Sequence, residues 1–396
     1  MDNVDKMSKD EQLAVFQLSL WFMEFSRAFV VLNLRDDTYE RFKNEPPLDT
    51  YRSGITFHVE PPRFIDVVRR RLELSTRYLE NELEDRLSYE TKGGRVTYPK
   101  ELVGEFLDKI YTEIFNTHKN IGRLIQGLAG RDVRRALEIF EKILRSGHLS
   151  EEHITRRVTG RGEFELGEDL ILKAVMRGDY RFHSETSGFV ANVLYCSSAW
   201  VRPTNFLVPD ILFWLYKNRK IPGQLGLEGY FSVRFVAREL ELAGYVADDV
   251  SAAVDYCLRE NLLEADHFGR RLTSKEDNIK VTYSGFIHLR FLVDRIEYLY
   301  GILPATPVFI PREGKAIAEI LERELRDGDV TIQMKAQAVE ALFRHLKELY
   351  TSGVASFPAF GRAGSGASYV LDSVERAFRS VRTNGSDPPP NPLDTL

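Results

Sequence analysis

Two arginines stand in contexts where a guanidinium could act on a phosphate group. The first, Arg35, comes directly after the apolar run 28–34 and before Asp36 and Asp37. A continuous apolar run of this length predicts a central parallel strand, and ligands gather at the carboxyl ends of such strands. Arg35 could therefore meet a γ-phosphate or an acidic surface of a neighbouring subunit. An ion pair that caps the strand end is the simpler expectation.

The second, Arg134, lies in residues 130–137, which read Gly-Arg-Asp-Val-Arg-Arg-Ala-Leu. A glycine break, a helix start and an arginine on the first turn resemble the sensor-2 segment in the lid domain of AAA+ ATPases. The likeness is greatest to archaeal replication initiators and STAND ATPases, whose pattern is close to Gly-Asn/Asp-x-Arg-Arg-Ala-Leu. The resemblance implies that Arg134 reaches the nucleotide from the lid. Arg131 is one residue more than the pattern has, so the register of the match stays open.

The order of the predicted elements supports the same resemblance. A helix over 11–26 and the strand before Arg35 resemble the sensor-1 region, and the segment like sensor 2 follows at about one lid's length. A second interpretation makes the apolar run a Walker B strand, with Asp36 or Asp37 as the magnesium ligand, but the intervening Arg35 disfavours it. Over residues 10–300 the likeness rests on this arrangement more than on any single motif.

A phosphate-binding loop is not found in the sequence. P-loop NTPases carry Gly-x-x-x-x-Gly-Lys-Ser/Thr after their first strand, where backbone N–H groups and the lysine hold the phosphates. The nearest match is 361–368, Gly-Arg-Ala-Gly-Ser-Gly-Ala-Ser, with Ala367 in place of the lysine. We interpret it as a loop before a helix over 369–381. The chain is expected to bind no cofactor alone, and ATP with Mg²⁺ only together with a missing half of the ATPase core.

The predicted fold is mainly α with a partial α/β NTPase-core fragment. Five regions are expected: a remnant of the α/β P-loop NTPase core over 1–75, a helical lid over 76–165, a winged-helix domain over 166–303, a helical C-terminal region over 304–382 and a disordered tail over 383–396. The core remnant rests on the strands predicted over 28–34 and 55–59 and on a helix over 65–83. Two such strands do not form a stable sheet unaided, so this region is only a fragment.

The winged-helix prediction rests on residues 206–283. Helices are expected over 206–216, 232–243 and 248–260, followed by strands over 262–265 and 279–283 that enclose a polar tip. Three helices followed by a two-stranded hairpin are the order of a winged helix, a variant of the helix-turn-helix. A long helix over 285–299 and a helix-prone segment over 315–350 are expected to follow.

The charge of the third helix argues against reading DNA. Residues 248–263 carry four carboxylates and one basic side chain, which are Asp248, Asp249, Asp255, Glu260 and Arg259. A helix that enters the major groove approaches phosphates, which this charge balance repels. The hairpin is more basic, and its candidates for nucleic-acid contact are Arg270, Arg271, Lys275 and Lys280. Contact within the chain, with a protein partner or by self-association is therefore favoured over nucleic acid.

The composition limits the class of protein and its cellular compartment. The 396 residues carry 59 acidic and 54 basic side chains, a net charge of −5, so no global basic field attracts nucleic acid. The two cysteines, Cys196 and Cys257, lie far apart in apolar segments, which predicts reduced, buried thiols in a cytoplasmic protein and no zinc site. No signal peptide is visible, and no apolar run of about 18 residues could span a membrane, so no membrane partner is expected.

Three hypotheses follow for function. The first is a non-catalytic regulatory and interaction part of a STAND- or AAA+-like ATP-binding protein, produced as a separate chain or truncated. It would contact nucleotide or a partner through the lid and the winged helix, and the resemblance alone implies a bacterial or archaeal switch protein. The alternative is a winged-helix DNA-binding protein without a nucleotide role. The third is the remnant of a disrupted gene.

Overall fold

The computed structural model describes residues 9–27, 30–34, 62–81, 86–91, 94–99, 104, 108, 111–117, 119–130, 132–146, 168–178, 182–183, 189–266, 271–328, 330–353 and 365–382. Helices dominate these ranges, which confirms the mainly α prediction, and the strands form one two-stranded and one three-stranded sheet. The second predicted strand, over 55–59, and the predicted tail lie outside them. Within the described ranges, no helix is long and apolar enough to cross a membrane.

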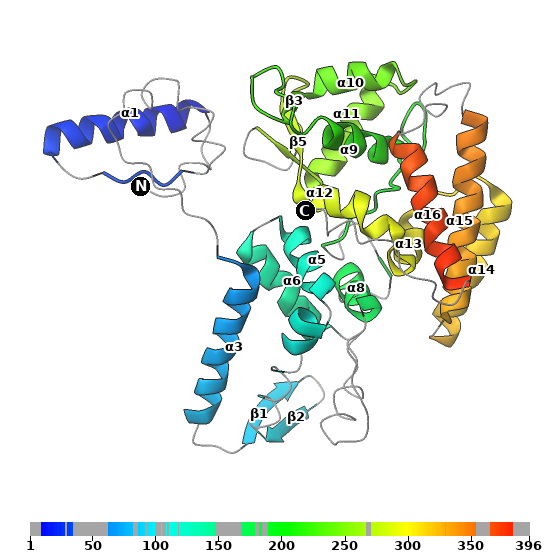
Figure 1. Ribbon diagram of the computed structural model, residues 1–396, viewed down its shortest axis with the longest axis horizontal. Coiled ribbons are helices and arrows are strands. Elements are labelled where there is room, and N and C mark those ends of the chain that lie inside the picture. The colour runs from blue at the N-terminus through cyan, green and yellow to red at the C-terminus, as the bar shows by residue number, and fades with distance from the viewer. Residues whose placement is uncertain are drawn as a thin grey trace.

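The first described helix, α1 (Lys9–Ser26), lies to one side of the other elements (Figure 1). Phe16 is buried in it, and the partly buried Leu32 and Leu34 pack against this ring. Residues 30–34 form no strand, so the predicted central strand is wrong for them. Leu32 and Leu34 lie against α1, whereas Val31 is 55% exposed.

The region predicted as a helical lid also contains a β-hairpin. The elements from here to the middle of the chain are α3 (Phe64–Asn81), β1 (Arg86–Thr91), β2 (Gly94–Pro99), the π-helix η3 (Glu113–Thr117), α5 (Lys119–Ala129), α6 (Val133–Arg145) and α8 (Glu168–Arg177). β1 and β2 pair antiparallel, with Arg86 opposite Pro99. Phe64 of α3 packs against Phe115 and Phe140, with ring centres 5.7 and 6.3 Å away, so these rings hold α3 to η3 and α6.

Residues 206–282 fold into helices and a small sheet in the predicted order. The elements are α9 (Leu207–Lys217), β3 (Phe231–Ser232), α10 (Val233–Glu241), α11 (Ala247–Arg259), β4 (Leu263–Ala265) and β5 (Asn278–Val281). The central strand β5 pairs antiparallel with both neighbours, so the sheet order is β3-β5-β4. The sequence prediction lacks β3, because a strand of two residues has no detectable alternation.

Two predicted helices are each divided in the structure. The first, 285–299, becomes α12 (Tyr283–Arg290), the 3₁₀ turn η4 (Leu292–Asp294) and α13 (Ile296–Ile302). Arg295 separates the last two in an extended conformation, and since the surrounding segment is almost wholly buried, apolar periodicity could not locate the break. The second, 315–350, becomes α14 (Pro311–Asp327) and α15 (Ile332–Gly353), because Gly328 ends α14 with a φ of +84°.

One large hydrophobic core runs from α3 to α16 (Gly366–Arg382). The last helix lies beside α15 and also packs on α9 (Figure 1), while η5 (Leu303–Ala305) connects α13 to the C-terminal helices. A buried ion pair joins Arg177 of α8 to Glu324 of α14 at 2.9 Å, and the Tyr300 hydroxyl donates to the same carboxylate at 2.7 Å. In the described part of the chain, the predicted lid, winged-helix and C-terminal regions therefore share one interior.

Candidate functional site

The helix start predicted around Arg134 is present. Asp132 caps α6, and its carboxylate accepts hydrogen bonds from the Arg134 N–H at 2.9 Å and the Arg135 N–H at 3.2 Å. Gly130 precedes it with a φ of +63°, a conformation that glycine adopts at little cost. The Arg134 side chain is exposed, whereas the guanidinium of Arg135 lies 5.4 Å from the centre of the Phe189 ring. Of the two arginines, Arg134 is the one that a ligand or partner could reach.

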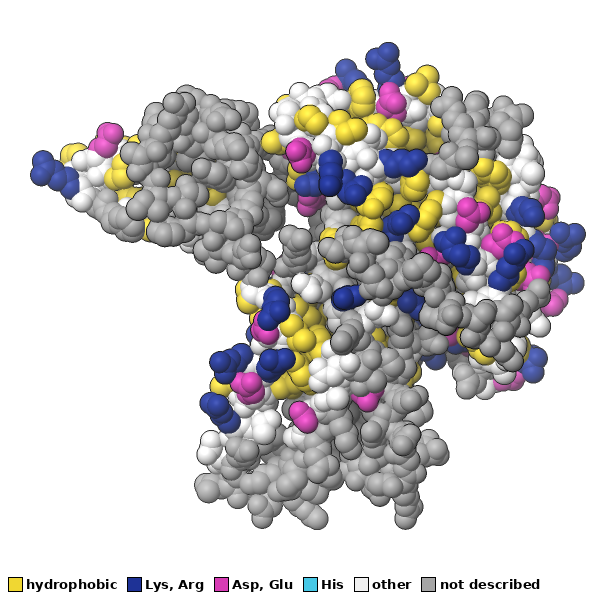
Figure 2. All heavy atoms as spheres, viewed as in Figure 1, with side chains coloured by type: hydrophobic (Ala, Val, Ile, Leu, Met, Phe, Trp, Pro, Cys, Tyr) yellow, Lys and Arg dark blue, Asp and Glu magenta, His cyan; other side chains and the backbone are white. Residues whose placement is uncertain are grey.

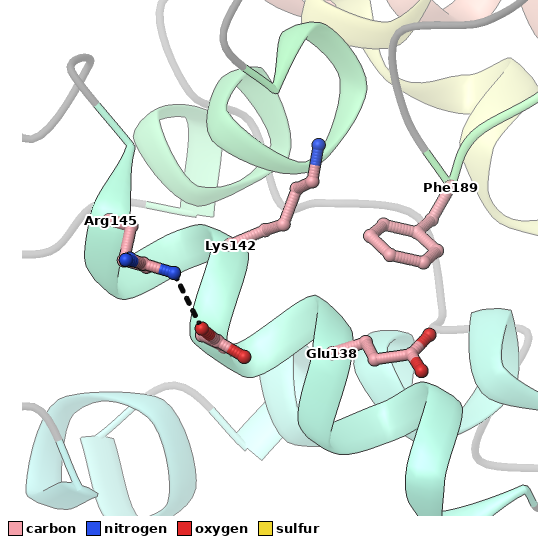
Figure 3. A pocket seen from close by; sticks show the side chains of 5 residues that line it. Glu138, Lys142, Arg145 and Phe189 are labelled. Carbon is pink, nitrogen blue, oxygen red and sulfur yellow. Dashed lines mark hydrogen bonds and ion pairs between the residues drawn. The ribbon is translucent and has the colours of Figure 1, made fainter.

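A surface hollow begins one helical turn after Arg134, on the same face of α6. It has a volume of about 470 Å³ and is lined by Glu138, Glu141, Lys142, Arg145 and Phe189. In Figure 3, Glu138 and Lys142 project from α6 on the side where Phe189 lies. Arg145 and Glu141 form an exposed ion pair at 2.8 Å, which contributes less than about 1 kcal/mol to stability. With two carboxylates among its four charged groups, the hollow matches a mixed-charge protein surface better than a bare phosphate.

Two of the candidate site residues, Arg35 and Arg270, lie outside the described residues. Arg271 is exposed at the beginning of the described part of the predicted wing, residues 271–277. Lys275 in the same segment donates to a carboxylate of α11. The structure therefore brings this lysine to α11, whereas Arg134 lies on another helix, α6.

Residues 271–277, the described part of the predicted wing, lie against α11, the helix that the sequence predicted in the recognition position. The Lys275 ammonium donates to Asp248 at 2.8 Å, and the Leu272 N–H donates to Asp255 at 2.9 Å. Lys280 lies on β5, with its ammonium 5.0 Å from the centre of an aromatic ring, that of Tyr230. Because a carboxylate already offsets one of the positive charges, the wing offers less attraction to a phosphate backbone than its composition suggests.

A segment that the sequence prediction missed, residues 189–206, covers another part of α11. The carboxylate of Asp249 accepts hydrogen bonds from the Val201 N–H at 2.8 Å and the Arg202 N–H at 2.9 Å. Asp249 itself is buried, so one of the carboxylates that predicted repulsion of DNA is engaged inside the fold.

The same segment is stacked on α11 through its aromatic residues. The rings of Tyr195 and Tyr256 lie parallel with centres 3.8 Å apart, and the Tyr256 hydroxyl also bonds to the backbone of Asn192. Five of the six residues over 189–194 are apolar, which indicates burial, but a segment without a helix or strand has no periodicity that would indicate its partner.

The buried titratable groups near this segment have structural roles. The Nε2 of His288 accepts from the Ala191 N–H at 2.8 Å, and its Nδ1–H donates to the Ser284 carbonyl at 2.7 Å. Burial lowers the pKa of His288 to about 4, so the ring is neutral at pH 7 and both nitrogens are engaged. Cys196 and Cys257 are free and buried as predicted, and burial raises the pKa of Cys196 to about 12. A thiol with that pKa supplies no nucleophile.

The stretch that most resembles a P-loop is the entrance to α16. The Ala367 N–H donates to Oδ1 of Asp210 at 2.9 Å, and this carboxylate is buried. It occupies the place at a helix N-terminus where a phosphate would lie. A Cβ on Gly366 would lie 2.5 Å from the Pro209 carbonyl oxygen, so only glycine fits there. Residues 365–368 therefore dock α16 onto α9. Residues 366–368 belong to the helix, which begins before the predicted residue 369, so the loop interpretation is wrong for them; residues 361–364 lie outside the described ranges.

Comparison of the chain with protein-family models, curated proteins and solved structures finds no match. Within the described ranges, no group of three or more His, Cys, Asp or Glu side chains could hold a metal ion. Figure 2 shows basic and acidic side chains interspersed over the visible face.

Proposed function

We propose that this chain is a regulatory and interaction module without ATPase activity of its own, organised like the lid and winged-helix part of a STAND- or AAA+-like ATPase. Support comes from the order of the units. An arginine-bearing helix start at Asp132 and Arg134 is followed by α9, β3, α10, α11, β4 and β5, in the order and with the sheet arrangement of a winged helix. Arg134 would then sense a nucleotide that another polypeptide holds.

The charge and the contacts of α11 favour protein contact over DNA. A recognition helix needs a free face to enter the major groove. On α11, Asp248 and Asp255 hold the wing, and Asp249 holds the 189–206 segment. The outward face of α11 carries Asp248, whose side chain is 80% exposed, and a carboxylate in this position would repel the phosphates of a groove.

DNA binding through the wing is the second candidate. It rests on the exposed Arg271 and on Lys275, whose side chain is 51% exposed. Both could contact phosphates without any helix entering a groove, which would give affinity with little sequence preference.

A fluorescence-anisotropy titration with duplex DNA separates the two candidates. We expect no binding tighter than about 100 µM at about 150 mM salt, the weak end of non-specific binding. Arg271→Glu reverses the exposed charge on the wing, and Arg326→Glu, at a 75% exposed side chain on α14, is the matched control. Micromolar binding that Arg271→Glu abolishes and Arg326→Glu preserves would overturn the proposal in favour of DNA binding.

An ATP titration tests the nucleotide part of the proposal. Calorimetry with ATP, with and without Mg²⁺, should show no saturable binding below about 1 mM, since no described segment offers a phosphate cradle. Tight, Mg²⁺-dependent binding by this chain alone would contradict a module that depends on nucleotide held elsewhere. Arg134→Ala would then show whether the arginine at the start of α6 contributes to that site.

A further inference from the structure

We propose that the exposed apolar face of α1 pairs with the same face of a second copy of this chain, with the two helices antiparallel. The face consists of Leu18, Trp21, Phe22 and Phe25, whose exposed fractions are 52%, 55%, 49% and 75%. Their spacing of i, i+3, i+4 and i+7 places them in one stripe along the helix. The pairing does not depend on the role proposed for α6 and α11.

The stripe is a continuous aromatic surface. The rings of Trp21 and Phe25 stack with centres 5.0 Å apart and planes 8° from parallel. Figure 2 shows hydrophobic side chains at the surface of α1. Single exposed apolar residues need no explanation, but a contiguous patch of several large ones marks an interaction site.

The opposite face of α1 is buried and includes polar side chains. Gln12 and Ser19 are buried beside Phe16, and the Ser19 hydroxyl donates to the Val15 carbonyl at 2.7 Å. The helix thus buries two polar side chains together with Phe16 and leaves three aromatic rings in water, which is more aromatic exposure than a monomeric surface helix normally has. A partner on the aromatic stripe would cover these rings.

The spacing of the stripe is symmetric about its midpoint between Trp21 and Phe22. A two-fold axis at that point, with the helices antiparallel, places Trp21 of one copy opposite Phe22 of the other and Leu18 opposite Phe25. Each apolar side chain then meets an apolar side chain, which is the self-complementarity that a two-fold interface requires.

Charge also favours the antiparallel arrangement. In a parallel pair, the acidic residues Asp10, Glu11 and Glu24 of one helix would lie beside the same residues of the other. In the antiparallel pair, Glu24 lies at the level of Ser19 along the other helix, so the acidic residues of the two copies do not lie side by side. A lipid surface is a poorer occupant, because the basic residues of this segment, Lys9 and Arg27, stand only at its two ends.

The area of the stripe predicts how strong the pairing is. Aromatic side chains bury about 150–250 Å² each, so these exposed fractions correspond to about 400–500 Å² per copy. Two copies would bury about 900 Å², which is the size class of weak and transient associations and not of obligate dimers. We therefore expect a dimer with a dissociation constant of about 10–100 µM.

Sedimentation velocity on the full chain from about 1 to 300 µM tests the association. The weight-average mass should rise from monomer toward dimer, and Phe25→Glu should weaken the association at least about tenfold. Leu242→Glu is the matched control, because Leu242 is 68% exposed in the turn that follows α10 and its substitution should leave the dimer unchanged. A wild-type chain that stays monomeric at the highest concentration, or a dimer that Phe25→Glu preserves, would overturn the proposal.

Disulfide trapping tests the antiparallel geometry. Positions 18 and 25 are seven residues apart, about 10 Å along a helix, so an antiparallel pair brings neither position near its own equivalent in the other copy. A mixture of the Leu18→Cys and Phe25→Cys chains should cross-link, and each alone should not, since the native cysteines are buried. Cross-linking of each variant with itself would indicate a parallel pair and contradict the proposal. Co-sedimentation with phosphatidylserine vesicles, lost in Phe25→Glu, without any dimer in solution would assign the stripe to lipid instead.

Discussion

The hydroxyl of Tyr256 serves both backbone polar groups of Asn192. It accepts a hydrogen bond from the Asn192 N–H at 3.1 Å and donates one to the Asn192 carbonyl at 3.0 Å. Tyr298 does the same for the flanking residues, accepting from the Val193 N–H at 3.0 Å and donating to the Ala191 carbonyl at 2.9 Å. Buried backbone groups without partners are costly, so the two hydroxyls supply what a neighbouring strand would supply in a sheet.

Tyr256→Phe should therefore lower the free energy of unfolding by about 1–3 kcal/mol, because it leaves buried backbone groups without their partner. The ring remains, so the stacking on Tyr195 is kept and the loss measures the hydroxyl. Urea denaturation would give the difference. Tyr78→Phe is the control, since Tyr78 is 68% exposed on α3 and should change stability little. Equal effects of the two substitutions would contradict this role for Tyr256.

These contacts also show where prediction from the sequence stops. The helices and hairpin of residues 206–283 could be predicted, because each is specified by its own apolar period and turn residues. The path of residues 189–202 could not, since it is set by Tyr256, His288 and Tyr298, which lie far along the chain. At the candidate site, the glycine break before Arg134 predicted the helix start. The bond between Lys275 and Asp248 joins residues that no local pattern relates.

His288 should make the protein less stable in acid. Burial lowers its folded pKa to about 4 from an ordinary value of 6.5, and a proton on Nε2 would displace the Ala191 N–H. As the pH falls from about 6.5 to about 4, the unfolded chain gains a proton that the folded chain does not. The free energy of unfolding should fall by up to about 3 kcal/mol over this range and level off below it.

His288→Gln removes that titration. The variant should be less stable than the wild type at pH 7, but its free energy of unfolding should fall less between pH 7 and pH 4. His345, whose folded pKa burial also lowers to about 4, should behave in the same way, and the double variant should be flatter than either single one. Denaturant titrations at several pH values measure this dependence. If the free energy of unfolding of the variants falls with pH as steeply as that of the wild type, the histidines are not the cause of the acid sensitivity.

Asp210, unlike His288, should make the protein less stable as the pH rises. Burial raises its folded pKa to about 6 from 3.8, although the Tyr245 hydroxyl donates to it at 2.5 Å and the Ala367 N–H donates at 2.9 Å. Between about pH 4 and pH 6 the folded state keeps a proton that the unfolded state releases. The contribution of Asp210 to the free energy of unfolding should therefore fall as the pH rises, by up to about 3 kcal/mol, and stay constant above pH 6.

Two substitutions at Asp210 separate its charge from its hydrogen bonds. Asp210→Asn keeps an acceptor for Ala367 and a polar partner for Tyr245, so it should remove the loss of stability between pH 4 and pH 6. Asp210→Ala leaves both donors unpaired and should destabilise the protein by about 2 kcal/mol or more at every pH. Thermal unfolding at pH 5 and pH 8 distinguishes the two. A pH dependence that survives in Asp210→Asn would mean that another group causes it.

Asp249→Ala tests the contact between α11 and the 189–206 segment. The Val201 and Arg202 N–H groups lose a charged acceptor, so their hydrogen exchange should accelerate by about tenfold or more. Asp248→Ala removes a neighbouring carboxylate that pairs with the exposed Lys275, and exchange at Val201 and Arg202 should stay unchanged.

Asp249→Ala also tests the proposed function. If α11 serves protein contact, Asp249→Ala should still not bind duplex DNA, even though it removes a negative charge from the helix. If it binds DNA where the wild type and Asp248→Ala do not, the 189–206 segment would be an inhibitory cover on a DNA-reading helix. The proposed regulatory role would then have to give way to one in which a signal releases that segment.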